Sequence, residues 1–428
     1  MKVQQSRQLI NPFGGIQFVL KHIKEQGIDT FIDEHLGSRG VKKEYSISDG
    51  LLATHYSHLC GGSCMEDINT LNEHIGFHPG LSLPSADTSL RVMQELKTED
   101  TIVENDGVIH TFNHHQKFND LLQKLAIKTK TIVAKADNTL DFDNVILENE
   151  KWDAAKTYKM TTGYQPAVAS IGRQVVFIEG RNGNTPASYK MNQTLAACFE
   201  LLKTNGISVK HFRSDSAAYQ QSVVEVLEKN GTHFYIRIDD SQNLRDAIKD
   251  IPETDWKQTT INNKKTEVAD TPFQPFGEKK TYRAVVQRRK SKDGQYDIFT
   301  QSPYAYYSVM TDNEEPAATP EWVTVFYNGR GDSEKNFDIL NNDFNCNRLP
   351  FSSLNANMVY LFAAAISFTL FEWIKRAFFS KGVIDNTAMR CKKFLFDFII
   401  LPAKWIKTAR QWVYKIFTTR TCYEPLFE

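Results

Sequence analysis

Cysteine is scarce in this sequence, with six residues scattered over 428 positions. Small secreted domains carry a denser framework of paired cysteines. Residues 1–6 also lack the apolar core of a signal peptide. A phosphate-cradling glycine-rich loop of the ATP-binding kind is absent as well. These absences exclude a disulfide-stapled scaffold, give no indication of ATP use, and lead us to expect a cytoplasmic protein.

Long apolar runs are missing too. The longest uncharged stretch, 349–371, includes Pro350, Asn355 and Asn357, so its continuous apolar part is shorter than the ~20 residues that span a bilayer. We interpret it as a buried core helix and expect no membrane partner. Hydrophobic residues make up 41% of the chain and charged residues 24%, which is typical of a folded globular protein. The length fits several domains, because single cores stop growing near ~250 to 300 residues.

Net charge is zero, with 51 basic and 51 acidic side chains, so bulk charge does not indicate nucleic acid. The distribution is uneven, however. Residues 375–420 contain eleven Lys or Arg but only Asp385 and Asp397 as acids, which leaves the rest of the chain acidic. A basic tail can follow phosphates, and an acidic body can hold cations. A solvated lysine-rich helix face explains the tail equally well.

Hydrophobic periodicity divides the first half of the chain into two parts. Residues 1–125 show short amphipathic segments and predict a helical domain. Such a domain is compatible with a helix-turn-helix DNA-binding unit, although small bundles of other purposes are commoner. Residues 126–253 show strands in succession and then strands alternating with helices. This order predicts a mixed sheet covered by helices.

The second half changes pattern twice. Residues 254–326 show alternating β segments with a turn signal at Asn262 and Asn263, and they predict an all-β insertion that includes a strand at 296–300. Residues 327–380 have helical spacing. The remaining residues, 381–428, are predicted to form a basic helical tail.

Three acidic residues stand where a mixed α/β core would bring side chains together. Asp143 lies within an apolar strand, Asp215 follows a strand, and Glu334 opens a helix. An unpaired carboxylate is costly to bury, so a strand aspartate normally pairs with a cation or binds a metal. Shared carboxylates can hold two Mg²⁺ about 3.5 to 4 Å apart and so promote phosphoryl transfer. The alternative is that all three are ordinary surface acids.

The neighbours of Glu334 have a distinctive spacing. Tyr327, Arg330 and Glu334 follow one another with two and then three residues between them. This pattern resembles the Tyr, Arg, Glu signature of insertion-sequence DDE transposases. If the helix begins early, Arg330 and Glu334 lie one turn apart, and a phosphate-binding guanidinium stands beside a metal ligand. The family signature continues with a Lys where this chain has Asn341, and Lys335 could replace that Lys.

The resemblance extends over nearly the whole chain, to the thirteen-eighty group of insertion sequences. The segments that carry it, in order, are LDFDN at 140–144, TGYQP at 162–166, GNTP at 183–186, FRSDS at 212–216, NNDF at 341–344 and LPAKWI at 401–406. The resemblance implies an α/β fold: a ribonuclease H-like mixed sheet flanked by helices, with an all-β insertion and a helical N-terminal domain. Residues 126–253 and 327–380 would then be the two parts of the catalytic core.

What the resemblance implies about function is DNA transposition. The three carboxylates would bind two Mg²⁺, with Mn²⁺ able to substitute, to cleave the element's ends and join freed 3′-hydroxyls to target DNA. Tyr327, Arg330 and Lys335 would contact the DNA. The expected partner is double-stranded DNA, at the terminal inverted repeats and at the target. A homodimer on DNA is expected because two ends must be joined, and the cytoplasmic protein would associate with the nucleoid.

Two residue assignments stay open at this point. Asp141 would lie on the same face of its strand as Asp143, because alternate strand residues point the same way. We prefer Asp143, since the family's aspartate precedes a small polar residue. A zinc site is the second question. Its candidate ligands match no common zinc spacing, so we expect them to pack in the helical domain; they are His55, His58, Cys60 and Cys64.

Two other functions fit the same residues. One is a ribonuclease H-like nuclease that cuts DNA without strand transfer. The other is a domesticated, non-catalytic transposase that only binds DNA. The presence of all three carboxylates argues against the second, because an inactive protein would be free to lose any of them.

Overall fold

The computed structural model describes residues 1–277, 280–290 and 302–427. Eleven of the described strands form one mixed sheet. In their order across the sheet they are β1 (Thr101–Asn105), β2 (Val108–His114), β8 (Gln174–Arg181), β7 (Ala167–Ile171), β3 (Asn138–Asn144), β9 (Val209–Ser214), β10 (His233–Arg237), β14 (Tyr304–Thr311), β13 (Tyr282–Lys290), β12 (Lys264–Phe273) and β11 (Lys257–Ile261). The expected mixed α/β organisation is therefore confirmed.

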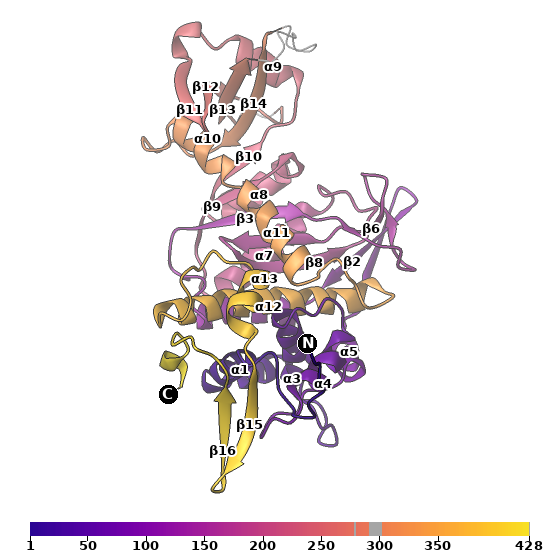
Figure 1. Cartoon of the computed structure of the whole chain (residues 1–428). Helices are drawn as coiled ribbons and strands as arrows, with labels where there is room; N and C mark the ends of the chain where they lie inside the picture. Colours follow the sequence, from indigo (N-terminus) through magenta and orange to yellow (C-terminus); the bar gives the residue numbers. More distant parts are fainter. Residues whose placement is uncertain (278–279, 291–301, 428) are drawn as a thin grey trace.

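Helices surround this sheet. They are α1 (Ile16–Glu25), α2 (Ile28–Leu36), α3 (Ile47–Leu59), α4 (Asp67–Ile75), α5 (Ala86–Glu95), α6 (Gln116–Lys128), α7 (Met191–Thr204), α8 (Gln221–Lys229), α9 (Gln242–Lys249), α10 (Pro320–Asn328), α11 (Gly331–Asp343), α12 (Leu354–Ser380) and α13 (Cys391–Phe394). Figure 1 shows strands β11 to β14 at the top, the rest of the sheet in the middle, and α12 lying between the sheet and the N-terminal helices.

Strand β3 lies near the middle of the sheet, fifth in this order. It runs antiparallel to β7 and parallel to β9, and β10 continues the parallel set. Leu140 and Phe142 of β3 are fully buried in the core that contains α7 and α8. Because successive side chains alternate between faces, Asp141 and Asp143 point to the opposite side. On that side Val168 of β7 packs in the core that contains α12.

Helix α12 is the longest helix of the described chain, with 27 residues. By length and composition it could cross a membrane, but 94% of its apolar window is buried inside the protein. A charged pair also lies within it: Lys375 is fully buried and contacts Glu372 at 2.6 Å. The expected buried core helix is confirmed.

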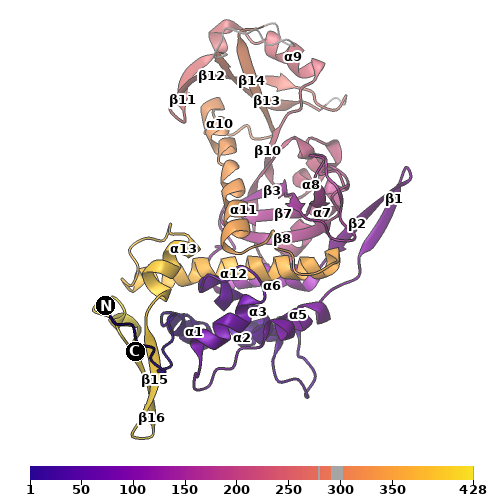
Figure 2. The ribbon, with the colours of Figure 1, turned by 45° about the vertical axis from the view of Figure 1, so that its right-hand side comes forward.

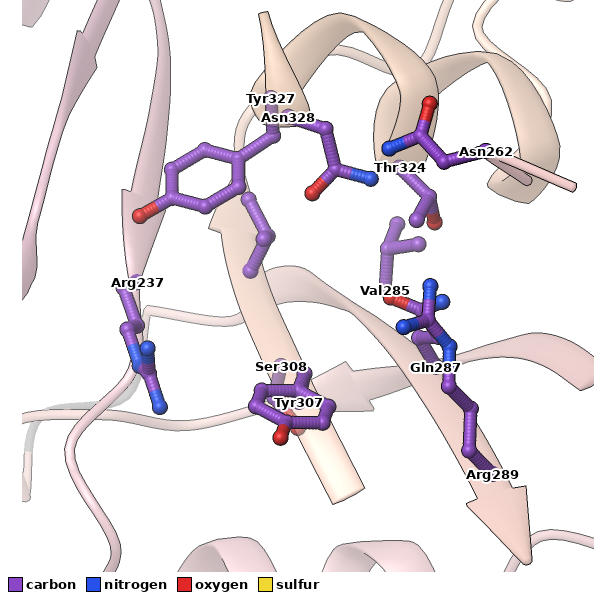
Figure 3. Close-up of a pocket in the computed structure, with 11 residues that line it drawn as sticks. Arg237, Asn262, Val285, Gln287, Arg289, Tyr307, Ser308, Thr324, Tyr327 and Asn328 are labelled. Carbon is purple, nitrogen blue, oxygen red and sulfur yellow. The ribbon is translucent and has the colours of Figure 1, made fainter. Parts of the chain in front are cut away.

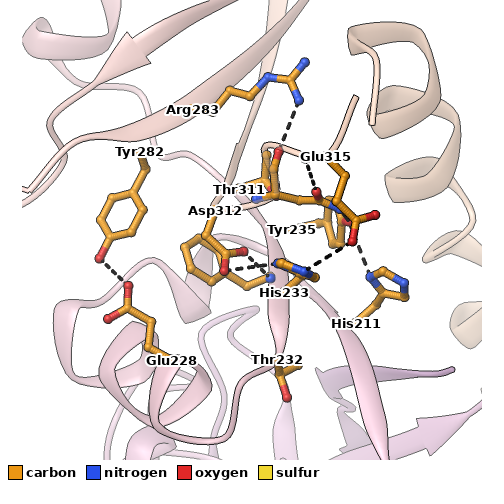
Figure 4. Close-up of polar contacts among 12 residues, drawn as sticks. His211, Glu228, Thr232, His233, Tyr235, Tyr282, Arg283, Thr311, Asp312 and Glu315 are labelled. Carbon is orange, nitrogen blue, oxygen red and sulfur yellow. Dashed lines mark hydrogen bonds and ion pairs between the residues drawn. The ribbon is translucent and has the colours of Figure 1, made fainter. Parts of the chain in front are cut away.

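Polar contacts fasten the outer strands to the middle of the sheet (Figure 4). Asp312, just after β14, accepts a hydrogen bond from the backbone N–H of Phe234 in β10 at 3.0 Å. The hydroxyl of Tyr282 in β13 donates to Glu228 in α8 at 2.9 Å. The Arg283 guanidinium also binds the Asn313 carbonyl at 3.2 Å. The outer strands are thus attached by backbone pairing and by side chains from several elements.

The N-terminal domain is not helical up to residue 125. Helices α1 to α5 form as expected, but residues 101–114 form the hairpin β1–β2, whose second strand pairs with β8. Helix α6 packs against the sheet, because Asn119 exchanges hydrogen bonds with the Ile178 backbone in β8. Asp106 and Gly107 have positive φ values of 50° and 76°. An Asp-Gly pair at such a turn is a strong signal for a β-hairpin. The helical periodicity of the neighbouring segments led instead to the prediction of a helical domain.

The predicted all-β insertion, 254–326, is an extension of the main sheet, because β14 pairs with β10. Its turn at Asn262 and Asn263 has the expected positive φ values, 51° and 59°. The insertion ends earlier than expected, since α10 begins at Pro320. The strand expected at 296–300 lies outside the described residues.

Beyond residue 399 the C-terminal tail has only one short helical segment among the described residues, the 3-10 turn Glu424–Leu426. It forms a two-stranded hairpin of β15 (Ala403–Thr408) and β16 (Gln411–Ile416). Pro402 cannot continue a helix, and the segments that flank the turn are rich in aromatic and β-branched residues, which favour strands. The turn itself uses Ala409 and Arg410 at φ 46° and 69°. These residue types seldom adopt positive φ, so the turn carries no sequence signal.

Candidate active site

Asp143 is the first, in chain order, of the three carboxylates of the candidate site. It is the sixth residue of β3, and its side chain is 21% exposed. Burial raises the pKa of Asp143 to about 6, because Arg330 opposes the rise only in part and the nearby charge of Asp215 adds to it. A carboxylate held in this unfavourable setting attracts a further cation.

Asp215 lies beside Asp143 because of the strand register. β3 and β9 are parallel, and Phe142 pairs with Ser214, so the residues that follow these two are neighbours. Asp215 accepts a hydrogen bond from the Ala217 backbone N–H at 3.0 Å. This bond orients the carboxyl group at the end of the strand and leaves its second oxygen available.

Arg330 and Glu334 come from the junction of α10 and α11. Arg330 is the residue directly before α11, and Glu334 lies one turn into that helix. The Arg330 guanidinium contacts Asp143 at 2.9 Å and Glu334 at 3.6 Å. Burial alone would lower its pKa, but Tyr327 and the three carboxylates together raise it. The structure therefore brings all three predicted carboxylates around one guanidinium.

Tyr327 and Lys335 are placed differently. The Tyr327 hydroxyl donates to the backbone oxygen of Ser214 at 3.3 Å, beside Asp215. Lys335 is 78% exposed and forms an ion pair with Asp332 at 2.7 Å. Asn341, where the family signature has Lys, has a buried side-chain oxygen without a hydrogen-bond partner among the described residues. Tyr327 thus faces the site, whereas Lys335 faces solvent.

Asp141 is engaged in another contact. Both of its carboxylate oxygens accept hydrogen bonds from Arg213 at 2.7 Å, and its side chain is only 4% exposed. Arg213 also donates to the backbone oxygen of Phe326 at 2.6 Å. Gly329 permits this approach, because a Cβ there would lie 2.6 Å from the Arg213 guanidinium. The Asp141 carboxylate therefore ties β3 to β9 and to α10.

The chemistry of the donors fits a hard divalent cation, although the site is not a closed chelate. No group of three or more His, Cys, Asp or Glu side chains in the described ranges is arranged to hold a metal. Instead Arg330 supplies positive charge between Asp143 and Glu334. Carboxylate oxygens are the ligands that Mg²⁺ prefers, and Glu334 is 68% exposed, so it has room to turn. Arg330 thus occupies the space that an ion bridging Asp143 and Glu334 would take.

A hollow of about 350 Å³ opens next to Tyr327. Figure 3 shows Tyr327 and Asn328 along its upper side, with Arg237 and Arg289 on opposite sides below them. The Arg237 guanidinium lies over the ring of Tyr307, 5.5 Å from its centre. Two cations and an aromatic ring form a surface that suits a phosphodiester strand. No sequence motif marks Arg237 or Arg289, which lie in β10 and β13, so neither residue was predicted for the site.

The four candidate zinc ligands lie in α3 and just after it, and among the described residues they form no group arranged to hold a metal; they are His55, His58, Cys60 and Cys64. Burial lowers the pKa of His55 to about 3 and that of His58 to about 4. The Cys391 thiol contacts the His58 backbone oxygen at 3.6 Å, and Cys60 is buried as well. His55, His58 and Cys60 therefore pack in the helical core, whereas Cys64 is only partly buried.

Comparison with known proteins gives one strong similarity. Residues 13–427 match the family model described as Transposase DDE domain group 1. No curated protein sequence matches the chain. A piggyBac transposase synaptic complex with hairpin DNA aligns at 10% identity and TM-score 0.43, over 92% of this chain and 80% of that one. The Drosophila P element transposase strand transfer complex aligns at 14% identity and TM-score 0.25, over 57% and 53%. Both structural scores are too low to establish a shared fold.

Proposed function

Because the chain belongs to the family of transposase DDE domains, group 1, we propose that it is a DNA transposase that cleaves the ends of a mobile element and joins them to target DNA. The observation that carries this proposal is the position of Arg330, in contact with Asp143 and Glu334 and within the field of Asp215. Three acids remote in sequence share one positive neighbour. We further propose the thirteen-eighty group of insertion sequences as the relevant branch of the family.

The proposed cofactor is a pair of Mg²⁺ ions, for which Mn²⁺ would substitute. Asp143 and Asp215 would hold them, and Glu334 would complete one site. The chemistry that such ions supply is stabilisation of the attacking and leaving oxygens in phosphoryl transfer. The raised pKa of Asp143 supports this role, because burying that carboxylate without a cation is unfavourable.

A phosphate of the DNA backbone would replace Asp143 as the partner of the Arg330 guanidinium. Arginine binds phosphate through paired N–H groups as readily as it binds carboxylate. Arg330 would therefore turn from Asp143 to a phosphate when a cation enters, while Tyr327 positions the same strand. Lys335, exposed on α11, would add a phosphate contact at the outer edge. The hollow with Arg237 and Arg289 lies beside this path.

We propose that strands β8, β7, β3, β9 and β10 are a ribonuclease H-like core. An antiparallel set, β8-β7-β3, that continues through β3 into the parallel strands β9 and β10 supports this proposal. Asp143, on β3, and Asp215, directly after β9, lie at neighbouring positions of this core, because β3 and β9 are adjacent and parallel. The partners would be element ends and target DNA, bound by a homodimer in the cytoplasm.

The test uses DNA that carries the element's end, cut from the sequence flanking the gene, with Mg²⁺. The native chain should cleave this DNA and produce joined products. Asp215→Asn and Glu334→Gln should bind the DNA as the native chain does but leave it uncut. Asp332→Asn is the matched control, because it removes an exposed charge from the same helix, and it should cleave normally.

Each outcome has a defined meaning. Cleavage by Asp215→Asn or Glu334→Gln would reject the assigned site. Cut ends without joined products would indicate a nuclease without strand transfer. Binding by the native chain without cleavage under Mg²⁺ or Mn²⁺ would indicate a domesticated DNA-binding protein.

A further inference from the structure

The hairpin of β15 and β16, residues 403–416, is the most isolated part of the described fold; we call it the tail hairpin. Figures 1 and 2 show it pointing away from the body, at the end opposite to β11–β14. Within the described chain its two strands form a separate two-stranded sheet. Its base is attached to the N-terminal segment through two backbone hydrogen bonds between Asn11 and Ala403, at 2.8 and 2.9 Å. Two-stranded hairpins of this kind have little stability of their own.

One face of the tail hairpin packs against the protein. Trp405 and Tyr414 lie across from each other, with ring centres 4.7 Å apart. Trp412, on the same face, contacts Phe77 at 4.8 Å, and His78 contacts Trp405 at 5.0 Å. The aromatic face therefore holds the hairpin against the loop after α4.

The opposite face carries the unusual feature. Lys404 and Lys415 are directly paired across the strands, followed by Ile406 with Val413 and Thr408 with Gln411. Like charges in this position repel each other and destabilise a hairpin. Residues 398–423 contain no acid, and in the part of the chain that the structure describes Lys404 contacts the Gln8 amide oxygen at 3.3 Å and lies over the ring of Phe417.

The remaining cations of the tail hairpin are also without acidic partners. Lys407 lies over the ring of Trp412, and Lys415 lies over that of Phe417. Arg410, at the exposed tip, forms no ion pair within the described ranges. The paired lysines contact one amide oxygen and one aromatic ring but no carboxylate of the described residues, so an anion from outside would relieve their repulsion.

We propose that the tail hairpin enters the major groove of double-stranded DNA. This inference rests on the proposed function, which supplies a duplex as partner. The major groove admits a two-stranded ribbon, and its walls are phosphates that can neutralise Lys404 and Lys415. At the tip, Arg410 and Gln411 have the donors that recognise guanine and adenine edges in that groove.

A second copy of the chain is a poorer occupant of this face. A symmetric contact places the same surface on both sides, so it would bring two Lys404–Lys415 pairs together. Duplex DNA offers the opposite charge on both sides of the ribbon. Charge therefore favours DNA over self-association.

The test measures binding of the full chain to a fluorescent 40-base-pair duplex of mixed sequence over a series of NaCl concentrations. Each lost phosphate contact lowers the slope of log affinity against log salt by about 0.9, so Lys404→Gln/Lys415→Gln should lower it by about 2. The matched control is Lys203→Gln/Lys229→Gln, which removes two exposed lysines at the ends of α7 and α8 and should keep the native slope. Thermal melting checks folding, and the hairpin variant should melt no lower than the native chain, because it loses a repulsion.

The groove is tested with Arg410→Ala/Gln411→Ala. This variant should bind the duplex less tightly than the native chain. The difference should vanish when methyl green fills the major groove and persist when netropsin fills the minor groove. Persistence under methyl green would overturn the major-groove assignment.

The remaining outcomes separate this inference from the proposed function. A native slope in Lys404→Gln/Lys415→Gln, in a chain that still cleaves end DNA, would overturn the tail hairpin proposal alone. A changed molecular mass in light scattering with an unchanged slope would assign the face to a second copy instead. Failure of the native chain to bind any duplex would overturn both proposals.

Discussion

Asp141 and Asp143 stand two residues apart on the same face of β3, yet they meet arginines in different ways. Asp141 is 4% exposed and forms two equal bonds with Arg213; we call this the closed pair. Asp143 is 21% exposed and forms one bond with Arg330, which also contacts Glu334; we call this the open cluster. In the closed pair one acid is matched by one arginine. The open cluster has three acids around one arginine.

A buried acid can either hold segments of the chain together or stay available to bind a cation. Burial raises the pKa of Asp141, and the Arg213 bonds oppose that rise. Burial also raises the pKa of Asp143, but there a second acid adds to the rise. A pair with matched partners mainly holds segments together, while an excess of acids keeps a place for a cation.

The largest expected effect is the loss of the closed pair. Asp141→Asn would strand the buried Arg213 guanidinium and lower the free energy of unfolding by about 3 to 5 kcal/mol. Urea unfolding followed by tryptophan fluorescence measures this. Replacing both partners, as Asp141→Leu/Arg213→Met, should recover most of the loss, because no charge stays unpaired. A stable single variant would show that the pair does not fasten β3 to α10.

The next effect concerns cations at the open cluster. Mg²⁺ or Mn²⁺ at a hundred times its Kd should raise the free energy of unfolding by about 2.7 kcal/mol, seen as a higher melting temperature. Asp143→Asn should abolish this rise, since a ligand is lost, while Asp332→Asn should keep it. An equal rise in Asp143→Asn would locate the ion elsewhere.

A smaller effect depends on pH. Because the pKa of Asp143 is about 6 in the folded chain and ordinarily 3.8, the folded state holds this proton more tightly. Ionisation therefore costs folding free energy as pH rises from about 4 to about 6, and the full cost remains above that. Without divalent ions, Asp143→Asn should be more stable than the native chain by at most about 3 kcal/mol at pH 8, an upper bound that solvent screening of the 21% exposed carboxylate reduces, and equally stable below pH 4. Thermal melts across this range measure the difference; a gain at pH 4 would contradict the assignment.

The smallest effect is expected for Lys335, which lies outside both groups. Lys335→Gln should leave the melting temperature unchanged, because the side chain is 78% exposed. It should lower the salt slope of DNA binding by about 1 if it contacts a phosphate. An unchanged slope would remove Lys335 from the proposed DNA surface.

Local patterns in the sequence predicted a large part of this structure. Alternation identified β3, and the spacing of Arg330 and Glu334 anticipated their contact at the start of α11. The proximity of Asp143 to Asp215 followed from adjacent strands. Their catalytic roles stay predictions, since proximity alone does not establish them.

The missed features depend on distant or weakly marked residues. Asp141 and Asp143 look equivalent in the strand, and only Arg213, supplied by the neighbouring β9, distinguishes them. The tail hairpin turns at Ala409 and Arg410, which carry no turn signal. Periodicity reports the face of an element but not which charged side chain arrives from elsewhere.

The junction of α10 and α11 has a mechanical consequence. Helix α10 lies against β12 and β13, whereas α11 is bound to the middle of the sheet through Asn336, whose amide donates to the Gly172 backbone oxygen at 2.9 Å. Arg330 stands at the elbow between them. Because Arg213 also binds the end of α10 to β9, both sides of the elbow are fixed to the inner sheet, and only the Arg330 side chain is left to turn toward or away from Asp143.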